Sequence, residues 1–173
     1  MEEGAAESPA LVSRMETRDQ LLRVCSLLND NGARHLIVDG HACILHGHVR
    51  TTEDVDILVE DSLENFQRVI TGLSALEDHA AAELKPQDIA DNVVVKIADE
   101  VEVDVSRQAW QVRYADAVAT AEAITIDGVR VPFISLEMLI QSKTTYREQD
   151  RADLVRLRDL LELKRMRPDS QAS

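Results

Sequence analysis

The chain has 173 residues, of which 45% are hydrophobic and only 3% aromatic, and its formal net charge is −13. This length suits one domain whose core is filled by aliphatic side chains. The charge argues against a protein that holds nucleic acid by bulk attraction to phosphates, so a nucleotide or a tRNA end would need a local basic groove or a bound metal.

Both ends of the sequence are expected to be flexible tails. Residues 1–14 and 167–173 combine small and polar residues without a helical period, which leaves one domain over 15–166. No apolar run approaches the length of about 18 residues that predicts a membrane span, and the N-terminus lacks the features of a signal peptide. Cys25 and Cys43 lie in apolar segments without close spacing. We therefore expect reduced core thiols in a cytoplasmic protein.

The first half of the chain alternates helical and strand patterns. Asn31-Gly32 is a stop signal for the first helix, and Ser62 is an N-cap for the third. Alternation with period two predicts the second strand. In chain order, we expect helices over 17–31, 40–47 and 62–76, separated by strands over 35–38 and 54–60.

The second half begins with strands that short turns connect. Ala98-Asp99-Glu100 predicts one hairpin, and Asp127-Gly128 is a strong two-residue hairpin signal. Ser135 caps a final helical stretch, interrupted at 147–150, that ends near Lys164. The expected strands cover 93–97, 101–105, 123–126 and 129–133. This order of elements predicts an α+β (α/β-like) fold with a mixed β-sheet flanked by helices.

Two of the predicted strands carry acidic residues suited to metal chemistry. Asp54 and Asp56 point to the same side of a strand, about 7 Å apart at Cα. Asp104 shares the polar face of a later strand with Glu102. If the two strands are neighbours, Asp54, Asp56 and Asp104 converge and offer hard oxygen ligands to Mg²⁺ or Mn²⁺, which suits nucleotidyl displacement. Taken alone, the D-x-D pattern also fits a solvated strand end.

A strand that runs into Gly40 and a helix N-terminus precedes these carboxylates and presents backbone amides to an anion. With this turn, the segment 39–57 resembles the DNA polymerase β-like nucleotidyltransferase superfamily. It is most similar to small bacterial members of the lincosamide-modifying type and of the abortive-infection or toxin–antitoxin type. The matching residues are Gly40, Gly47, Arg50, Thr52, Asp54, Asp56 and Ile57, with Asp104 as the third carboxylate. A softer C-terminal match consists of Leu139, Lys143, Arg147, Asp150, Asp153 and Leu154.

The resemblance implies a nucleotidyltransferase fold and an enzyme that moves a nucleoside monophosphate from an NTP to an acceptor hydroxyl. The acceptor would belong to a small molecule, a protein side chain or a tRNA end. Asp54, Asp56 and Asp104 would hold two Mg²⁺ ions, and Asp104 would help to activate the acceptor. Gly40 and the amides after it would cradle the β and γ phosphates. The residues implied in nucleotide binding are Gly40, His41, Arg50, Thr52 and Lys143.

His41 departs from the family pattern, which has Gly or Ser at this position. Its ring would point outward, crowd the triphosphate, or donate a hydrogen bond to it as an imidazolium. This departure keeps open a second class of function. The chain would then be a non-catalytic nucleotidyltransferase-fold binding module or a toxin–antitoxin component with an antitoxin-like partner. A purely structural acidic domain is a third option.

Several charged residues have two interpretations each. Arg50 either pairs with Asp54 or Asp56 or grips a phosphate, and Lys143 either reaches nucleotide phosphates or is a solvated helix lysine. Asp153 is expected to pair with a nearby arginine. The basic residues of 164–167 fit a solvated helix end or an RNA contact. The spacing of His41, His46 and His48 is poor for zinc on one helical face.

Overall fold

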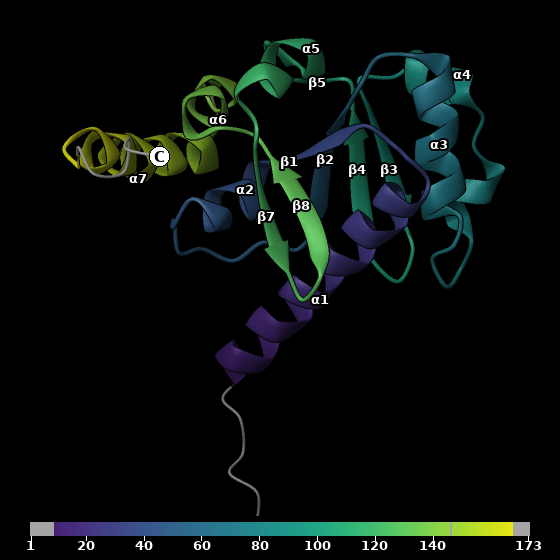
Figure 1. Ribbon diagram of the computed structural model, residues 1–173, viewed down its shortest axis with the longest axis horizontal. Helices are drawn as coiled ribbons and strands as arrows, with labels where there is room; N and C mark the ends of the chain where they lie inside the picture. Colours follow the sequence, from purple (N-terminus) through teal and green to yellow (C-terminus); the bar gives the residue numbers. More distant parts are fainter. Residues whose placement is uncertain (1–8, 146, 168–173) are drawn as a thin grey trace, which may run out of the picture.

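The computed structural model describes residues 9–145 and 147–167, without the side chains of 10–14. Within these residues, one mixed sheet of six strands forms the centre of the molecule, in the order β3-β4-β2-β1-β8-β7 (Figure 1). β2 pairs with β1 antiparallel and with β4 parallel, and β1 pairs with β8 parallel. The strands are β1 (His35–Val38), β2 (Val55–Val59), β3 (Val94–Ala98), β4 (Glu102–Ser106), β7 (Glu122–Ile126) and β8 (Val129–Phe133).

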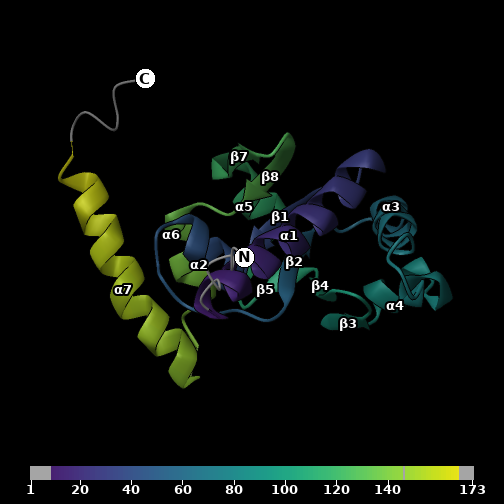
Figure 2. The ribbon, with the colours of Figure 1, turned by 90° about the horizontal axis from the view of Figure 1, so that it is seen from below.

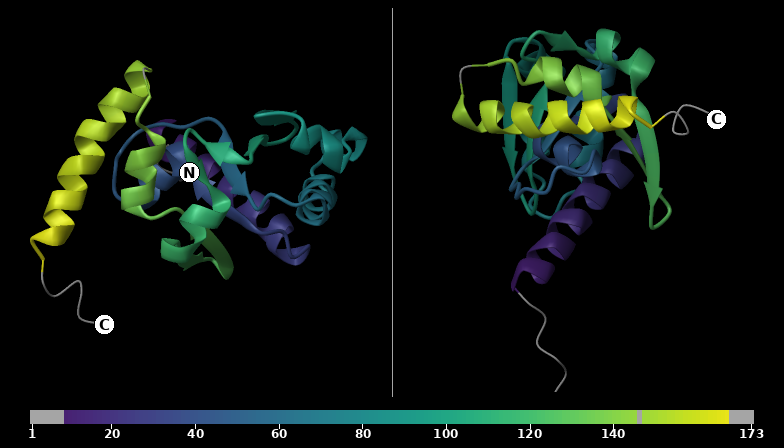
Figure 3. Two further views of the ribbon diagram at one scale, coloured as in Figure 1. Left: turned by 90° about the horizontal axis from the view of Figure 1, so that it is seen from above. Right: turned by 90° about the vertical axis from the view of Figure 1, so that its left-hand side faces the viewer.

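Helices pack around this sheet and at its two ends. α1 contacts β8 and α3, while α2 contacts β1, β2 and α6. α3 and α4 lie at one end of the molecule and α7 at the other, beside α6 (Figures 2 and 3). The α-helices are α1 (Pro9–Asp30), α2 (Asp39–Leu45), α3 (Leu63–Leu73), α4 (Pro86–Ala90), α5 (Tyr114–Ala117), α6 (Leu136–Ser142) and α7 (Glu148–Arg165), with 3-10 turns at Ala80–Glu83 and Val118–Thr120. None of the described helices is both long and apolar enough to cross a membrane.

Local sequence signals explain much of this architecture. Ser62 caps α3, because its hydroxyl accepts a hydrogen bond from the amide of Asn65 at 3.2 Å. Asp127 and Gly128 adopt φ values of 49° and 80°, as a type I′ hairpin turn between β7 and β8 requires. The mixed sheet flanked by helices is therefore the fold class that the sequence predicts.

The expected N-terminal tail is too long. α1 begins at Pro9, so the segment 9–14 is helical rather than part of a tail, while 1–8 and 168–173 lie outside the described residues. Proline is favoured in the first turn of a helix because that turn needs no amide donor, and the alanine and leucine that follow are good helix formers. The absence of an apolar period over these residues concealed the helix.

Cys25 and Cys43 are both buried and free. Burial raises the pKa of the two thiols, to about 12 for Cys25 and about 11 for Cys43. The thiols therefore stay protonated at neutral pH and pack as small apolar groups, as expected from the sequence.

Candidate active site

Strands β2 and β4 lie side by side, which brings two of the predicted carboxylates together. Asp56 is paired in register with Asp104, and Val55 with Val103. Residues paired in register face the same side of a sheet. The valines are fully buried on one side and anchor both strands, so the two aspartates share the other side.

Asp56 and Asp104 line a cavity of about 490 Å³. Its other walls come from the end of β1, from β3, from the hairpin of β5 (Gln108–Ala109) and β6 (Val112–Arg113), and from the segment after α6. The cavity is lined by Val38, Asp39, Asp56, Val94, Lys96, Asp104, Ser106, Ala109, Trp110, Ser142, Lys143, Thr145 and Arg147.

Asp56 is the most perturbed acid of this cavity. Burial, followed by the negative charges of Asp39 and Asp104, raises the pKa of Asp56 from its ordinary 3.8 to about 8. A hydrogen bond to Asp104 and the charge of Asp54 add to the effect. Near neutral pH, a proton or a cation must therefore offset the repulsion at this point. Converging carboxylate oxygens are the ligands that Mg²⁺ and Mn²⁺ prefer, so the residues fit such an ion.

Asp54 lies at the edge of this arrangement. It precedes the first residue of β2 and is not among the residues that line the cavity. Asp54 interacts with Glu102 at the start of β4: the protonated Glu102 donates a hydrogen bond to Asp54, and this bond and the charge of Asp54 raise the pKa of the exposed Glu102. After burial, the charge of Asp39 has the largest influence on the pKa of Asp56, and the charge of Asp54 has a smaller one.

A different trio of acids lies beside the cavity. Among the described residues, Asp39, Asp150 and Asp153 have carboxylate oxygens within 4.8 Å of one another, which is close enough to share a metal ion. The ammonium of Lys143 occupies that position. It forms an ion pair with Asp39 and lies 3.2 Å from Asp150 and 2.9 Å from Asp153. The cation shared by all three acids is therefore a lysine, and Arg50 and Arg147 form further ion pairs with Asp153 and Asp150.

Lys143 itself is only 2% exposed. Burial alone would lower its pKa, but the charge of Asp39 and the hydrogen bonds of Asp39 and Asp153 outweigh burial and raise the pKa above the usual range. The lysine thus stays charged. Because its ammonium is enclosed by three carboxylates, the interpretation of Lys143 as a solvated helix lysine is wrong.

Arg50 belongs to the same network. Its Nη1 lies 2.7 Å from Asp153, and His48 approaches the other oxygen of that carboxylate at 3.0 Å. Of the two interpretations of Arg50, the ion pair with Asp54 or Asp56 is therefore wrong, because the guanidinium pairs with a buried carboxylate of the C-terminal helix instead. The expectation that Asp153 pairs with a nearby arginine is confirmed.

The turn from β1 into α2 is tightly constrained. Asp39 has a φ of 57°, a left-handed conformation that non-glycine residues rarely adopt and that often marks functional sites. Gly40, the next residue, is buried, and a Cβ added to it would lie 2.4 Å from Oγ1 of Thr52. Gly40 is thus needed so that the segment before β2 can approach this turn, and neither Gly40 nor Thr52 lines the cavity.

His41 points inward. The residue is 3% exposed and does not line the cavity, and burial, followed by the charge of Arg50, lowers its pKa to about 4. The ring is neutral at neutral pH, so the expected outward orientation and the expected imidazolium donor are both wrong. His46 contacts the carbonyl of Ile134, while His48 contacts Asp153. None of the three histidines belongs to the group of described residues that could share a metal ion.

Cationic and aromatic groups complete the cavity. Lys96 lies beside Asp104 on β3, with Nζ 3.6 Å from Oδ2 of Asp104. Arg147 pairs through Nε with Asp150 at 2.8 Å. Trp110, the only tryptophan of the chain, is 45% exposed in the β5–β6 turn with a φ of 55°. The cavity therefore combines paired carboxylates, two exposed cations, the buried Lys143 and an exposed aromatic ring.

Sequence reasoning missed three of these lining residues. Lys96 had a usable signal, because the predicted hairpin places it on the strand beside that of Asp104, although the expected turn at 98–100 would pair it with Glu102 rather than with Asp104 as in the structure. Asp39 also had one, since an acid at the end of a buried apolar strand is unusual. Trp110 lies in the turn between two strands of two residues each, which are too short to produce a periodic pattern.

We compared the chain with known proteins and protein families. A search of curated proteins gives no match. Among solved structures, an antigenic nucleotidyltransferase-like protein from Paracoccidioides brasiliensis is 18% identical, with 89% of this chain and 91% of that chain covered and a TM-score of 0.50. A nucleotidyltransferase candidate from Thermotoga maritima is 15% identical, with coverage of 88% and 93% and a TM-score of 0.48. Only the first likeness supports the fold, and at such identity it supports nothing further.

The family comparison is more informative than either structure. The family model described as nucleotidyl transferase of unknown function (DUF2204) matches residues 17–171. Since this match covers nearly the whole chain, including every residue of the cavity, the protein belongs to that nucleotidyl transferase family.

Proposed function

We propose that this protein is a metal-dependent enzyme that transfers a nucleoside monophosphate from an NTP to an acceptor hydroxyl. The observation that carries the proposal is the in-register pair of Asp56 and Asp104 on a cavity wall, where the pKa of Asp56 is raised to about 8 by burial and by neighbouring acids. Such repulsion is expected where a protein reserves a position for a cation.

Asp56 and Asp104 would hold Mg²⁺ or Mn²⁺, with Asp54 as a further ligand from the edge of the cavity. When bound, the ions polarise the phosphoryl group and neutralise its charge. Asp56 would give up its proton on binding, because a metal ligand must be ionised. Asp104 would also accept the proton of the acceptor hydroxyl, as in the family that the sequence resembles.

The remaining walls suit the other parts of an NTP. Arg147 and Lys96 are the exposed cations of the cavity, and we assign them to the triphosphate. Lys143 would act indirectly, by holding Asp39 and Asp150 in place. Trp110 offers an exposed ring on which a base can stack, a contact that tolerates any base.

Gly40, Thr52, His41 and Arg50 would have a supporting role in this mechanism. The first two pack against each other, and His41 is buried beside Arg50, so the set shapes the turn that presents Asp39. The burial of this turn also favours the alternative function, a nucleotidyltransferase-fold binding module or toxin–antitoxin component without catalysis. We also propose that the enzyme resembles the lincosamide-modifying or toxin-type members, and that its acceptor is a small molecule, a protein side chain or a tRNA end.

Calorimetric titration with each of the four NTPs, with and without Mg²⁺, tests nucleotide binding first. We expect Mg²⁺-dependent binding that Asp56→Asn and Asp104→Asn abolish, while Asp159→Asn at an exposed position of α7 leaves binding intact. Incubation with an NTP labelled at the α-phosphate and a cell extract then tests transfer. Nucleotide binding without transfer to any component would favour the binding module. Absence of nucleotide binding would refute the cavity as a nucleotide site, for the enzyme and for the binding module alike.

A further inference from the structure

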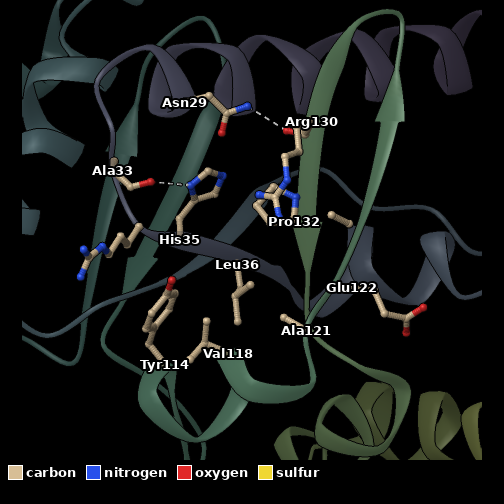
Figure 4. Close-up of a pocket in the computed structure, with 12 residues that line it drawn as sticks. Asn29, Ala33, His35, Leu36, Tyr114, Val118, Ala121, Glu122, Arg130 and Pro132 are labelled. Carbon is tan, nitrogen blue, oxygen red and sulfur yellow. Dashed lines mark hydrogen bonds between the residues drawn. The ribbon is translucent and has the colours of Figure 1, made fainter.

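A second cavity lies between α1, β1, β8 and α5, and it encloses about 270 Å³ (Figure 4). It shares no lining residue with the cavity of Asp56 and Asp104. The nucleotidyl transfer proposed above does not use it. Its polar lining includes Asn29, His35, Tyr114 and Arg130.

The cavity exists because β1 and β8 separate. Their register contains a single pair, Ile37 with Phe133. Pro132, the neighbour of that pair, has no amide hydrogen and cannot extend the ladder. Towards the start of β1, His35 therefore lies on one side of a gap and Pro132 on the other (Figure 4). Asn29 of α1 fixes this wall, because its side-chain amide donates to the carbonyl of Arg130 at 2.8 Å.

His35 brings an unsatisfied hydrogen-bond acceptor to this gap. The residue is 4% exposed, and burial lowers its pKa to about 4, so the ring is neutral at neutral pH. Its Nδ1 lies 3.1 Å from the carbonyl of Ala33, which can only accept, so Nδ1 carries the ring hydrogen. Nε2 is then an acceptor, and it has no partner among the described residues. A buried polar atom left in this state costs about 1–3 kcal/mol.

Arg130 brings a positive charge to the same gap. Its charge contributes to the low pKa of His35, so the two side chains are close. In Figure 4 the edge of the His35 ring that is turned away from Ala33 faces the strand that carries Arg130. Within the described part of the chain, the guanidinium of Arg130 has no recorded ion pair. Tyr114 adds a hydroxyl that stays protonated, because burial and then the charge of Glu60 raise its pKa.

We propose that this cavity binds a small oxyanion that keeps an O–H of its own, with hydrogen phosphate and a hydroxycarboxylate as the two sources of that chemistry. Arg130 holds the charged oxygens, and the O–H of the ligand donates to Nε2 of His35. Sulfate or acetate would form an ion pair with Arg130 but has no O–H at neutral pH to donate to Nε2 of His35. A cavity of about 270 Å³, just below the usual range of about 300–1,000 Å³ for ligand sites, admits a molecule of a few heavy atoms.

Matched pairs of probes test the proposal on the full chain. Phosphate is compared with sulfate, and glycolate with acetate, near neutral pH at constant ionic strength. Binding is followed by NMR of protein labelled with ¹⁵N-histidine, in which the His35 signals are assigned by their loss in His35→Phe. In at least one pair we expect the probe with an O–H to bind about tenfold more tightly than its partner and to shift the Nε2 resonance of His35. The pair that responds identifies the source of the ligand.

Arg130→Gln should weaken that binding at least about tenfold, since hydrogen bonds to charged groups are the stronger ones. Arg156→Gln, at an exposed position of α7, is the matched control and should bind as the wild type does. Arg130 is exposed, so the arginine test stands even if His35→Phe fails to fold. Equal binding within both pairs, no binding of any probe at millimolar concentration, or binding that Arg130→Gln leaves intact would each overturn the proposal.

Discussion

Asp56→Asn should stabilise the metal-free protein at alkaline pH, although it removes a residue that we place at the centre of the site. The amide has nearly the shape of the protonated carboxyl and carries no charge. In the wild type, burial, Asp39 and Asp104 disfavour the ionised form of Asp56 and raise its pKa from 3.8 to about 8. The unfolded chain has no such neighbours, so it loses this proton near the ordinary pKa.

The sign of the pH dependence follows from proton binding. Between pH 4 and 8, the folded state keeps a proton on Asp56 that the unfolded state has released, so the free energy of unfolding falls as pH rises. Each pKa unit corresponds to about 1.4 kcal/mol, which gives an upper limit of about 5 kcal/mol at pH 8. Relaxation of the partly open cavity will reduce this, and we expect a loss of about 2–3 kcal/mol relative to Asp56→Asn.

Urea denaturation in EDTA from pH 5 to pH 9 measures the effect for the wild type and for Asp56→Asn. Their difference isolates Asp56, because groups such as His35 and His41 titrate alike in both proteins. Those buried histidines have pKa values lowered by burial to about 4, so they destabilise both proteins as pH falls below about 6.5. Saturating Mg²⁺ should stabilise only the wild type, since the ion needs the ionised carboxylate. A difference that stays constant with pH in EDTA would refute the raised pKa and the argument built on it.

Three further perturbations test other parts of the site. Lys143→Met should lower the free energy of unfolding by about 3–5 kcal/mol in urea denaturation, because it leaves buried carboxylates without the cation that they share. Lys96→Met, at an exposed position, should lower it by less than about 1 kcal/mol. Equal effects of the two substitutions would contradict the buried network. Gly40→Ala should lower the free energy of unfolding by about 1–3 kcal/mol, because the added Cβ clashes with Thr52. In the double variant, Thr52→Gly removes the clash and should restore most of that stability. No recovery would show that the clash is not the cause. Nucleotide with Mg²⁺ should quench the fluorescence of Trp110, and Trp110→Ala should weaken nucleotide binding by about 1–3 kcal/mol in calorimetry; unchanged fluorescence would remove the ring from the base site.

Elements with a strong local signal could be predicted from the sequence. The Ser62 cap and the Asp127-Gly128 turn are encoded by neighbouring residues, and both are present. The adjacency of Asp56 and Asp104 was a conditional prediction, since alternation within a strand fixes the face of each aspartate but not which strands are neighbours. The sheet order supplies the missing condition.

Segments with short elements could not be predicted in this way. Residues 78–92 and 107–121 contain α4, α5 and the β5–β6 hairpin, and each of these elements has five residues or fewer. A helical or strand period cannot develop over such lengths, and tertiary contacts decide the local structure. Trp110 was missed for this reason, although it lines the candidate active site.

The buried ion network was missed for a different reason, and its signal was present in the sequence. Asp150, Asp153, Leu154 and Leu157 follow the spacing of one helical face, and all four are buried on α7. Two acids at core-facing positions require buried cations, because an unpaired carboxylate cannot be removed from water at an acceptable cost. Lys143 is one such cation, and it contacts both acids. The aspartates of α7 thereby fix Lys143, and through it Asp39, whose charge is the strongest neighbouring influence on the pKa of Asp56. A helix outside the cavity therefore contributes to the electrostatics of the proposed metal site.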